Sequence, residues 1–124
     1  MKKRKVKTFV VLILSAVLWI SCSHTPLIPV TPAVSFSKDV QPLIIANCAM
    51  SGCHNSTGGE LFPLMTYNDI ASSDLVTPGN AKSSRLYTAI NGTGGDNSMP
   101  PAGQLGNDDV LMIYLWIEQG AKNN

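Results

Sequence analysis

The sequence predicts an all-α fold of about four helices. Apolar residues recur at helical spacing in four segments, about residues 37–47, 66–72, 82–91 and 107–119, with capping or turn residues beside them. No segment shows the alternation of apolar and polar residues that is typical of a half-buried strand, and no internal repeat is present. These observations favour a small helical domain over a sandwich, a barrel or an α/β fold.

The N-terminus resembles a secretory signal of the lipoprotein type. Five basic residues within the first seven positions precede an apolar run over residues 9–20, which is shorter than the about 20 residues that a membrane-spanning helix needs. The run ends before Ser21 and Cys22, as in a bacterial lipobox, although Trp19 stands where leucine is usual. We expect residues 1–21 to be removed and Cys22 to be lipidated. The alternatives are a retained signal anchor and a Cys22 that is free or paired.

Removal of residues 1–21 changes the net charge of the chain. The full sequence has nine basic and eight acidic residues, but five of the basic ones leave with the signal. The mature part therefore keeps four basic residues against eight acidic ones, a formal charge of −4. An acidic surface argues against a nucleic-acid partner and weakly suggests a basic docking partner. A solvated surface without a binding role explains the charge equally well.

Residues 22–34 contain three prolines and no periodicity, which indicates an extended tether between a membrane and a domain. His24 lies in this segment and is expected to be inert. The expected organisation is therefore a lipoprotein signal peptide at 1–21, a proline-rich tether at 22–34 and one domain at 35–124.

The first helix of the domain is expected to begin at Ser37 and to run into Cys48. Ser37 is a candidate N-cap, and Asp39 follows in the first turn, where the helix dipole favours a carboxylate. The next helix is expected to begin at Thr66 and to end near residue 72. Asp69, three residues after Thr66, completes a variant of the capping box.

The second half of the domain is expected to contain a helix over about 82–91, a long loop over 92–106 and a strong closing helix. A structureless loop of this length in a small domain is usually functional or disordered. Asn107 is the expected N-cap of the closing helix, and Gly120 stands where a glycine ends it. Its apolar stripe is expected to have Trp116 on its flank and to comprise Val110, Leu111, Ile113, Tyr114, Leu115 and Ile117.

Two cysteines and a histidine form the stretch that carries chemistry. Four residues separate Cys48 from Cys53, and His54 follows directly, so the stretch is a wider form of the haem attachment signature C-x-x-C-H. Each cysteine sulfur can add to one haem vinyl group, and the histidine can then ligate the iron. We expect Gly52 to remove a side chain where the backbone passes close to the porphyrin edge.

The same residues allow two other interpretations. Cys48 and Cys53 could form a local disulfide, which an oxidising compartment would favour. They could also bind zinc with His54, but such a site needs a fourth ligand. His24, the only other histidine, lies in the expected tether. The fixed adjacency of Cys53 and His54 favours haem, and with Cys22 lipidated no odd thiol is left over.

In this order the segments resemble a single-haem bacterial cytochrome c domain. The resemblance covers about residues 35–121 and implies a small cytochrome c-like fold wrapped round one covalently attached haem c. It implies His54 and Met99 as the axial ligands of the haem iron. The cysteine spacing is the one departure. The residues that carry the resemblance are 36–43, Cys48, Cys53 and His54, 67–69, 78–80, 84–87, 99–101 and 116–121.

Met99 is also the methionine that its position in the chain favours as a ligand. It lies in the long loop, is followed by two prolines, and is far enough from His54 in sequence to reach the other face of a porphyrin. Met65 is the alternative, but it lies only eleven residues after His54. Met112 lies on the closing helix and is expected to pack.

The expected function is that of an electron carrier in the bacterial cell envelope, lipid-anchored and facing the periplasm, with redox proteins as partners. With both axial positions filled the haem has no open site for a substrate, so the chain is not expected to be an enzyme itself, although it could serve a larger redox complex. One alternative is a haem enzyme subunit or gas-binding sensor with an open axial position. Another is a haem-free binding module stapled by a disulfide.

Overall fold

The computed structural model describes residues 32–56, 62–71, 74–101 and 103–124. Residues Pro32–Asn124 form one compact unit. Its described part contains helices and no strand, which confirms the predicted all-α class. The predictions for the signal peptide, for Cys22 and for the tether as far as residue 31 concern residues outside the described ones.

The described part has four α-helices and three shorter helical turns. In chain order they are η1 (Phe36–Val40), α2 (Gln41–Asn47), α3 (Tyr67–Ala71), η2 (Ala81–Ser83), α4 (Arg85–Ile90), η3 (Gly95–Asn97) and α5 (Asn107–Glu118).

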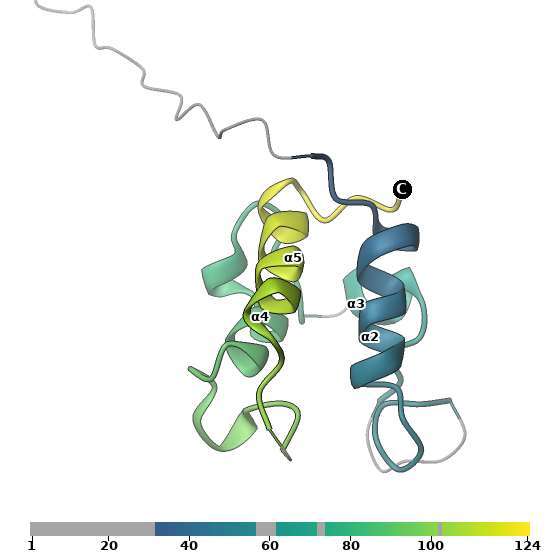
Figure 1. The fold of residues 1–124 in the computed structure, drawn as a ribbon. Coiled ribbons are helices and arrows are strands. Elements are labelled where there is room, and N and C mark those ends of the chain that lie inside the picture. The colour runs from purple at the N-terminus through teal and green to yellow at the C-terminus, as the bar shows by residue number, and fades with distance from the viewer. Residues whose placement is uncertain (1–31, 57–61, 72–73, 102) are drawn as a thin grey trace, which may run out of the picture. The chain divides into compact units, whose positions relative to one another are not determined.

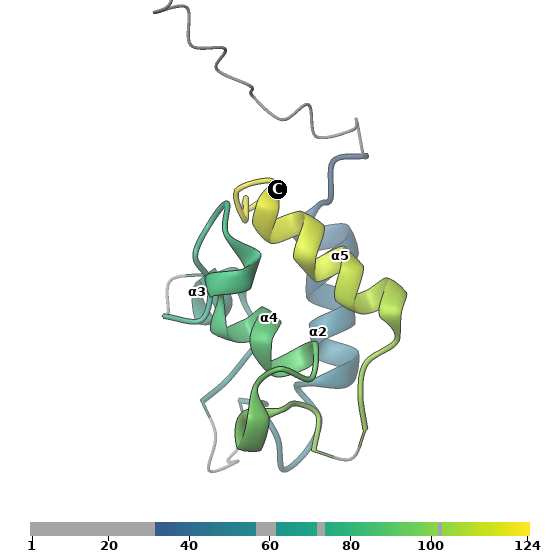
Figure 2. The same ribbon diagram turned by 90° about the vertical axis from the view of Figure 1, so that its left-hand side faces the viewer.

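The helices α2 and α5 run in opposite directions through the unit (Figures 1 and 2). The residues that precede η1 and those that follow α5 therefore meet at one end, which we call the tether end (residues 32–36 and 119–124). The turn after α2 and the loop before α5 lie at the other end, which we call the motif end (residues 48–56 and 92–101).

The first helix begins earlier than predicted, because Ser35 and not Ser37 is its N-cap. The Ser35 hydroxyl accepts a hydrogen bond from the Lys38 amide at 3.3 Å, and the Asp39 carboxylate accepts one from the Ser35 amide at 2.8 Å. The two bonds satisfy amides that the start of a helix leaves without partners. The π-helical η1 continues directly into α2, whose C-cap is Cys48, so the prediction that this helix runs into Cys48 is confirmed.

The predicted capping box of α3 is confirmed. The prediction of one continuous helix over 82–91 is wrong. Asp69 accepts a hydrogen bond from the Thr66 amide at 2.8 Å and donates its own amide to the Thr66 hydroxyl at 3.3 Å. The helix predicted over 82–91 is divided at the buried Ser84 into η2 and α4. The Ser84 hydroxyl accepts from the Thr77 amide and donates to the Asn80 carbonyl, both at 2.9 Å, and so ties this break to the preceding turn.

The loop over 92–106 was predicted to have no regular structure. The structure instead shows a helical turn within it, η3. The loop ends at Gly106, which is the N-cap of α5, and no side chain caps this helix. The prediction of Asn107 as the N-cap was therefore wrong, since Asn107 is the first helical residue.

The predicted end of α5 at Gly120 is confirmed. Gly120 has a φ of +99°, which a glycine adopts without strain. Its amide donates to the Ile117 carbonyl, and the Ala121 amide donates to the Trp116 carbonyl, each at 2.9 Å. This pair of bonds is a Schellman motif, which satisfies the last carbonyls of the helix.

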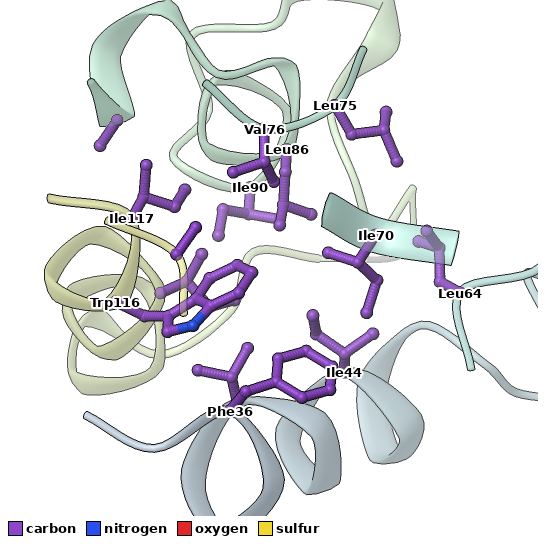
Figure 3. Close-up of a cluster of buried hydrophobic side chains, with 14 of the residues drawn as sticks. Phe36, Ile44, Leu64, Ile70, Leu75, Val76, Leu86, Ile90, Trp116 and Ile117 are labelled. Atoms are coloured by element: carbon purple, nitrogen blue, oxygen red, sulfur yellow. The ribbon is translucent and has the colours of Figure 1, made fainter. Parts of the chain in front are cut away.

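Trp116 was predicted on the flank of the apolar stripe of α5, but it belongs to the buried core. Its side chain is fully buried, and its ring centroid lies 5.5 Å from that of Phe36 and 6.4 Å from that of Tyr67. In Figure 3, Phe36 and Ile44 from the first helix extend into the core toward Trp116. The indole N–H donates to the Lys122 carbonyl at 3.0 Å, so the one polar atom of the ring is satisfied.

The apolar stripe of α5 is narrower than predicted. Ile113 and Ile117 are fully buried beside Trp116, but Leu111 is 52% exposed. The residues of α5 that pack only partly against the core are Val110, Met112, Tyr114 and Leu115.

Candidate functional site

Cys48 closes the first helix and is buried there. Its amide donates to the Ile44 carbonyl at 2.7 Å, and only 9% of its surface is exposed. Burial, and to a smaller degree the neighbouring Cys53 thiol, raises the pKa of Cys48 to about 11. The thiol is therefore protonated at neutral pH, and Cys48 is not an activated thiolate nucleophile.

The turn after Cys48 brings the other two motif residues back to the end of α2. The Cys53 amide donates to the Met50 carbonyl, and the His54 amide donates to the Cys48 carbonyl, each at 3.0 Å. The four intervening residues thus form a closed turn, so the wider spacing still keeps all three motif residues on one turn. Neither Cys48 nor Cys53 is in a disulfide.

Gly52 allows the backbone conformation of this turn. The expectation from the sequence was instead that this glycine permits close approach of the backbone to a porphyrin. Its φ is +82°, a region that side chains rarely adopt. A side chain placed there would meet none of the described atoms within 4 Å. The local requirement is thus a left-handed backbone at Gly52, and close approach of another group was a prediction that the structure leaves open.

His54 is held in one orientation by the segment that follows α2. Its side chain is 8% exposed, and its Nδ1 atom lies 2.8 Å from the Phe62 carbonyl oxygen. Since a carbonyl oxygen only accepts, Nδ1 must carry the hydrogen, and Nε2 keeps the lone pair that can bind a metal. The Leu64 amide donates to the His54 carbonyl at 2.9 Å, so residues 62–64 hold both the ring and the backbone of the histidine.

The sequence did not reveal the Phe62 carbonyl as part of the site. The Phe62 ring lies beside the imidazole, with centroids 4.9 Å apart. A backbone acceptor has no sequence signature of its own. The nearest signal is Pro63, which restricts the residue before it to extended conformations.

Met99 lies in the loop at the motif end, and this loop is attached to α4. The Met99 side chain is half-buried, and its amide donates to the Ala89 carbonyl at 2.9 Å. The peptide bond between Met99 and Pro100 is cis. Figures 1 and 2 both place this loop at the same end of the unit as the turn that contains His54.

The other methionines of the described part have different surroundings. Met65 precedes α3, where its carbonyl accepts from the Gln41 side chain at 2.8 Å and its amide donates to Asp69 at 3.2 Å. Met112 packs against the core from α5, as predicted. Met50, between the two cysteines, is 52% exposed.

The chemistry of these residues fits a covalently attached haem. Two reduced thiols and an imidazole with Nε2 available share one turn, which are the groups that attachment and axial ligation require. Ile45, Met50 and Phe62 are exposed although they are large and apolar, and all three lie within eight residues of the motif in sequence. An apolar porphyrin at this end would remove such surfaces from water.

Two further structural findings concern the described residues alone. Their His, Cys, Asp and Glu side chains form no group of three that could hold a metal ion. Their helices include none that is both long enough and apolar enough to cross a membrane.

Comparison with known proteins gives no relative for this chain. No protein-family model matches it, and neither a curated protein nor a solved structure matches it.

Proposed function

We propose that this protein is a membrane-anchored c-type cytochrome that carries electrons. One haem c is attached through Cys48 and Cys53, with His54 and Met99 as its axial ligands, and Cys22 carries the lipid anchor. The single observation that best supports this proposal is the hydrogen bond between His54 Nδ1 and the Phe62 carbonyl, directly after two unpaired cysteines.

That hydrogen bond supports the proposal over a disulfide-stapled module. A histidine that binds a metal usually donates its other ring N–H to a carbonyl or carboxylate, which fixes the tautomer and the orientation of the ring. A Cys48–Cys53 disulfide would give the buried His54 no comparable role. The raised pKa of the Cys48 thiol is compatible with a buried sulfur that is later converted into an uncharged thioether.

Each of the four proposed haem-binding residues then has a defined task. Cys48 and Cys53 hold the porphyrin through thioether bonds, formed as each S–H adds across a vinyl group with the hydrogen going to the other vinyl carbon. His54 and Met99 provide the imidazole and thioether ligands, a pair that raises the reduction potential. Haem bound in this way supplies one-electron chemistry by alternating between the ferric and ferrous states.

The proposed location is the bacterial cell envelope, on the periplasmic side of a membrane. It is supported by the signal pattern before Cys22 and by the cysteines themselves, which all have a use if one is lipidated and two hold haem. The partners are redox proteins, and nucleic acid is not among them, because the mature part has a formal charge of −4.

The proposal is tested by producing the full chain in a bacterium that has haem-attachment machinery. We expect haem to remain on the protein through a denaturing gel, and the absorption spectrum to be that of six-coordinate haem. A variant with both Cys48→Ser and Cys53→Ser should lose the haem. A haem-free protein with a Cys48–Cys53 disulfide would contradict the proposal. A ferrous form that readily binds carbon monoxide would favour an enzyme or a sensor.

A further inference from the structure

The backbone that enters the domain is held at the C-terminal end of α5 by one glutamine. The Val34 amide donates to Gln119 Oε1 at 2.8 Å, and Gln119 Nε2 donates to the Pro32 carbonyl at 3.4 Å. Val34 itself is buried, with 7% of its surface exposed. Residues 32–34 were expected to belong to a free tether, but their backbone is attached to the folded unit.

The next residues are attached to the segment that follows α5. The Phe36 amide donates to Asn124 Oδ1, and the Ser37 amide donates to the Asn124 carbonyl, each at 2.9 Å. The Ser35 hydroxyl donates to the same carbonyl at 2.8 Å. Gln119 and Asn124 therefore fix residues 32–37 from two sides, and the chain leaves the unit from a defined position at Pro32.

This exit lies at the opposite end of the unit from the candidate haem site. The first helix starts at the tether end and finishes at Cys48, and α5 starts after the loop that contains Met99 and finishes beside Gln119. Figures 1 and 2 show the same arrangement from two directions, with the C-terminus at the tether end. The length of the helices therefore separates the exit from the motif end.

The charged residues of the described part are distributed unequally between the two ends. Lys38 lies in η1 and Lys122 follows α5, both at the tether end. Lys82 in η2 and Arg85 in α4 lie between the two ends. The Ala81 amide donates to Glu118 Oε1 at 2.8 Å, whereas the Lys82 side chain shares a pocket with Asn91 and Thr93. The motif end instead has acidic residues, which are Asp96 in η3 and Asp108 and Asp109 in the first turn of α5.

Acidic groups at the tether end reduce this asymmetry but do not remove it. Asp39 and Glu118 lie there, and each carboxylate accepts a hydrogen bond from a backbone amide. Asp69 lies in α3, which is joined to this end by the hydrogen bond of 2.8 Å from the Tyr67 hydroxyl to the Ala121 carbonyl. Among the described residues, none of the loop over 92–101 or of the first turn of α5 is basic. A lipid surface with anionic headgroups would therefore repel the motif end more strongly than the tether end, within about a Debye length of the surface.

We infer that the anchored domain stands with its tether end toward the lipid surface and its motif end toward the aqueous phase. This inference rests on the proposed lipidation of Cys22. Ten residues separate Cys22 from Pro32, so the exit lies at most about 35 Å from the lipidated residue. The redox partner is then a protein that approaches from water with a basic surface, and not one whose docking surface lies in the membrane plane.

The orientation can be measured with nitroxide labels at two exposed asparagines. Asn107→Cys places a label at the motif end and Asn123→Cys places one at the tether end, and neither change alters a charge. The lipidated full chain is bound to vesicles of phosphatidylethanolamine and phosphatidylglycerol that contain a nickel-chelating lipid. We expect the nickel to broaden the spectrum of the Asn123 label severalfold more than that of the Asn107 label.

A second variant tests the role of the glutamine. Gln119→Ala should reduce the difference between the two labels, whereas Gln104→Ala, at an exposed position in the loop before α5, should leave it unchanged. A chain that floats with the vesicles but shows equal broadening at both labels overturns the orientation and leaves the cytochrome proposal intact. A chain that does not float with them overturns both the anchor and the orientation. Cys48 and Cys53 are replaced by serine in the labelled chains, so that only the introduced cysteine reacts with the nitroxide and neither outcome depends on whether haem is attached.

Discussion

His54 Nδ1 lies 2.8 Å from the carbonyl oxygen of Phe62. The two residues are eight positions apart, and the Leu64 amide returns a second bond to the His54 carbonyl at 2.9 Å. Backbone groups thus provide both of these hydrogen bonds to the buried His54, one to its ring and one to its carbonyl. Because the acceptor is a backbone carbonyl, a substitution of the Phe62 side chain changes the packing around His54 but keeps its hydrogen bond. The tautomer of the His54 ring is therefore a direct test of the site.

We predict that neutral His54 in the folded, haem-free protein is the tautomer with hydrogen on Nδ1. The Phe62 carbonyl can only accept, so the hydrogen must lie between the two atoms. Nitrogen NMR shifts of the imidazole distinguish the two tautomers. Phe62→Ala should keep this tautomer, because it removes the ring and leaves the carbonyl, whereas urea-unfolded protein should lose the preference. A folded protein with hydrogen on Nε2 would contradict the proposed ligand geometry.

The second prediction concerns stability at alkaline pH. In the reduced, haem-free protein Cys48 ionises near pH 11, whereas its unfolded-state pKa is 9.0, so the unfolded chain loses the proton first. The stability associated with the protonated thiol is complete below pH 9 and decreases as the pH rises from about 9 to about 11. The total loss should be about 3 kcal/mol in the free energy of unfolding, measured by urea titration at each pH.

Two comparisons isolate the contribution of this thiol. Cys48→Ser should remove the decrease, while Cys53→Ser should keep most of it, because burial is the larger cause of the raised pKa and the neighbouring thiol the smaller one. Protein with haem attached should not show it either, since a thioether does not ionise. An equal decrease in the wild type and in Cys48→Ser would show that other groups are responsible.

The third prediction tests the position of Trp116 in the core. Trp116→Ala removes a fully buried ring and the hydrogen bond to the Lys122 carbonyl, so we expect a loss of about 3–5 kcal/mol in the free energy of unfolding. Leu111→Ala is the matched control on the same helix. Because Leu111 is 52% exposed, its substitution should change stability by less than about 0.5 kcal/mol. Similar losses in the two variants would mean that the core is not centred on Trp116.

The fourth prediction concerns the anchor at Cys22. The mature protein should begin at Cys22, carry lipid and fractionate with membranes, because the basic and apolar segments before it resemble a lipoprotein signal. Cys22→Ala should change the processing of the precursor. Intact mass and N-terminal sequencing measure both properties. An unlipidated N-terminus in a host that processes lipoproteins normally is the result that would refute the anchor.

The parts of the fold that the sequence predicted correctly depend on neighbours in the chain. The capping box of Thr66 and Asp69 and the helix end at Gly120 involve residues only a few positions apart, so local chemistry determines them. The helix that ends at Cys48 was also predicted correctly, because its apolar residues recur at helical spacing within a short segment.

The predictions that failed depend on distant partners. Ser35 begins the first helix beside Asn124, and the hydroxyl of Ser35 donates to that residue's carbonyl across 89 positions. The break at Ser84 is the local exception, because its hydrogen-bond partners, Thr77 and Asn80, lie seven and four positions before it. Trp116 occupies the core centre because Phe36 and Tyr67 meet it there. Nothing in the spacing of apolar residues along one helix indicates such partners.

In the candidate site, too, some groups could be predicted from the sequence and others could not. Adjacency in the sequence was enough to select Cys48, Cys53 and His54, and the structure places them on one turn. The Phe62 carbonyl could not be identified, because a backbone acceptor looks the same at every residue. Met99 was selected from its loop, and its role stays a prediction, since the loop and the motif share one end of the unit without a described contact that would assign the ligand.

The last prediction therefore concerns Met99 in the protein with haem attached. Met99→Ala should abolish the weak red charge-transfer band of ferric methionine-ligated haem, lower the reduction potential and allow carbon monoxide to bind the ferrous form. The reason is that a soft thioether ligand favours the ferrous state and fills the axial position opposite His54. Absorption spectra and a redox titration measure all three changes.

Met65→Ala is the matched control, because Met65 is the other half-buried methionine close to the motif in sequence. Its backbone is held at the start of α3 by Gln41 and Asp69, whereas Met99 lies in a loop attached through the Ala89 carbonyl. We expect Met65→Ala to leave the band, the potential and the resistance to carbon monoxide unchanged. If Met65→Ala removes the band and Met99→Ala keeps it, the ligand is Met65. If neither variant changes the band, neither methionine ligates the iron, and an axial position is open in the wild type or filled by another residue.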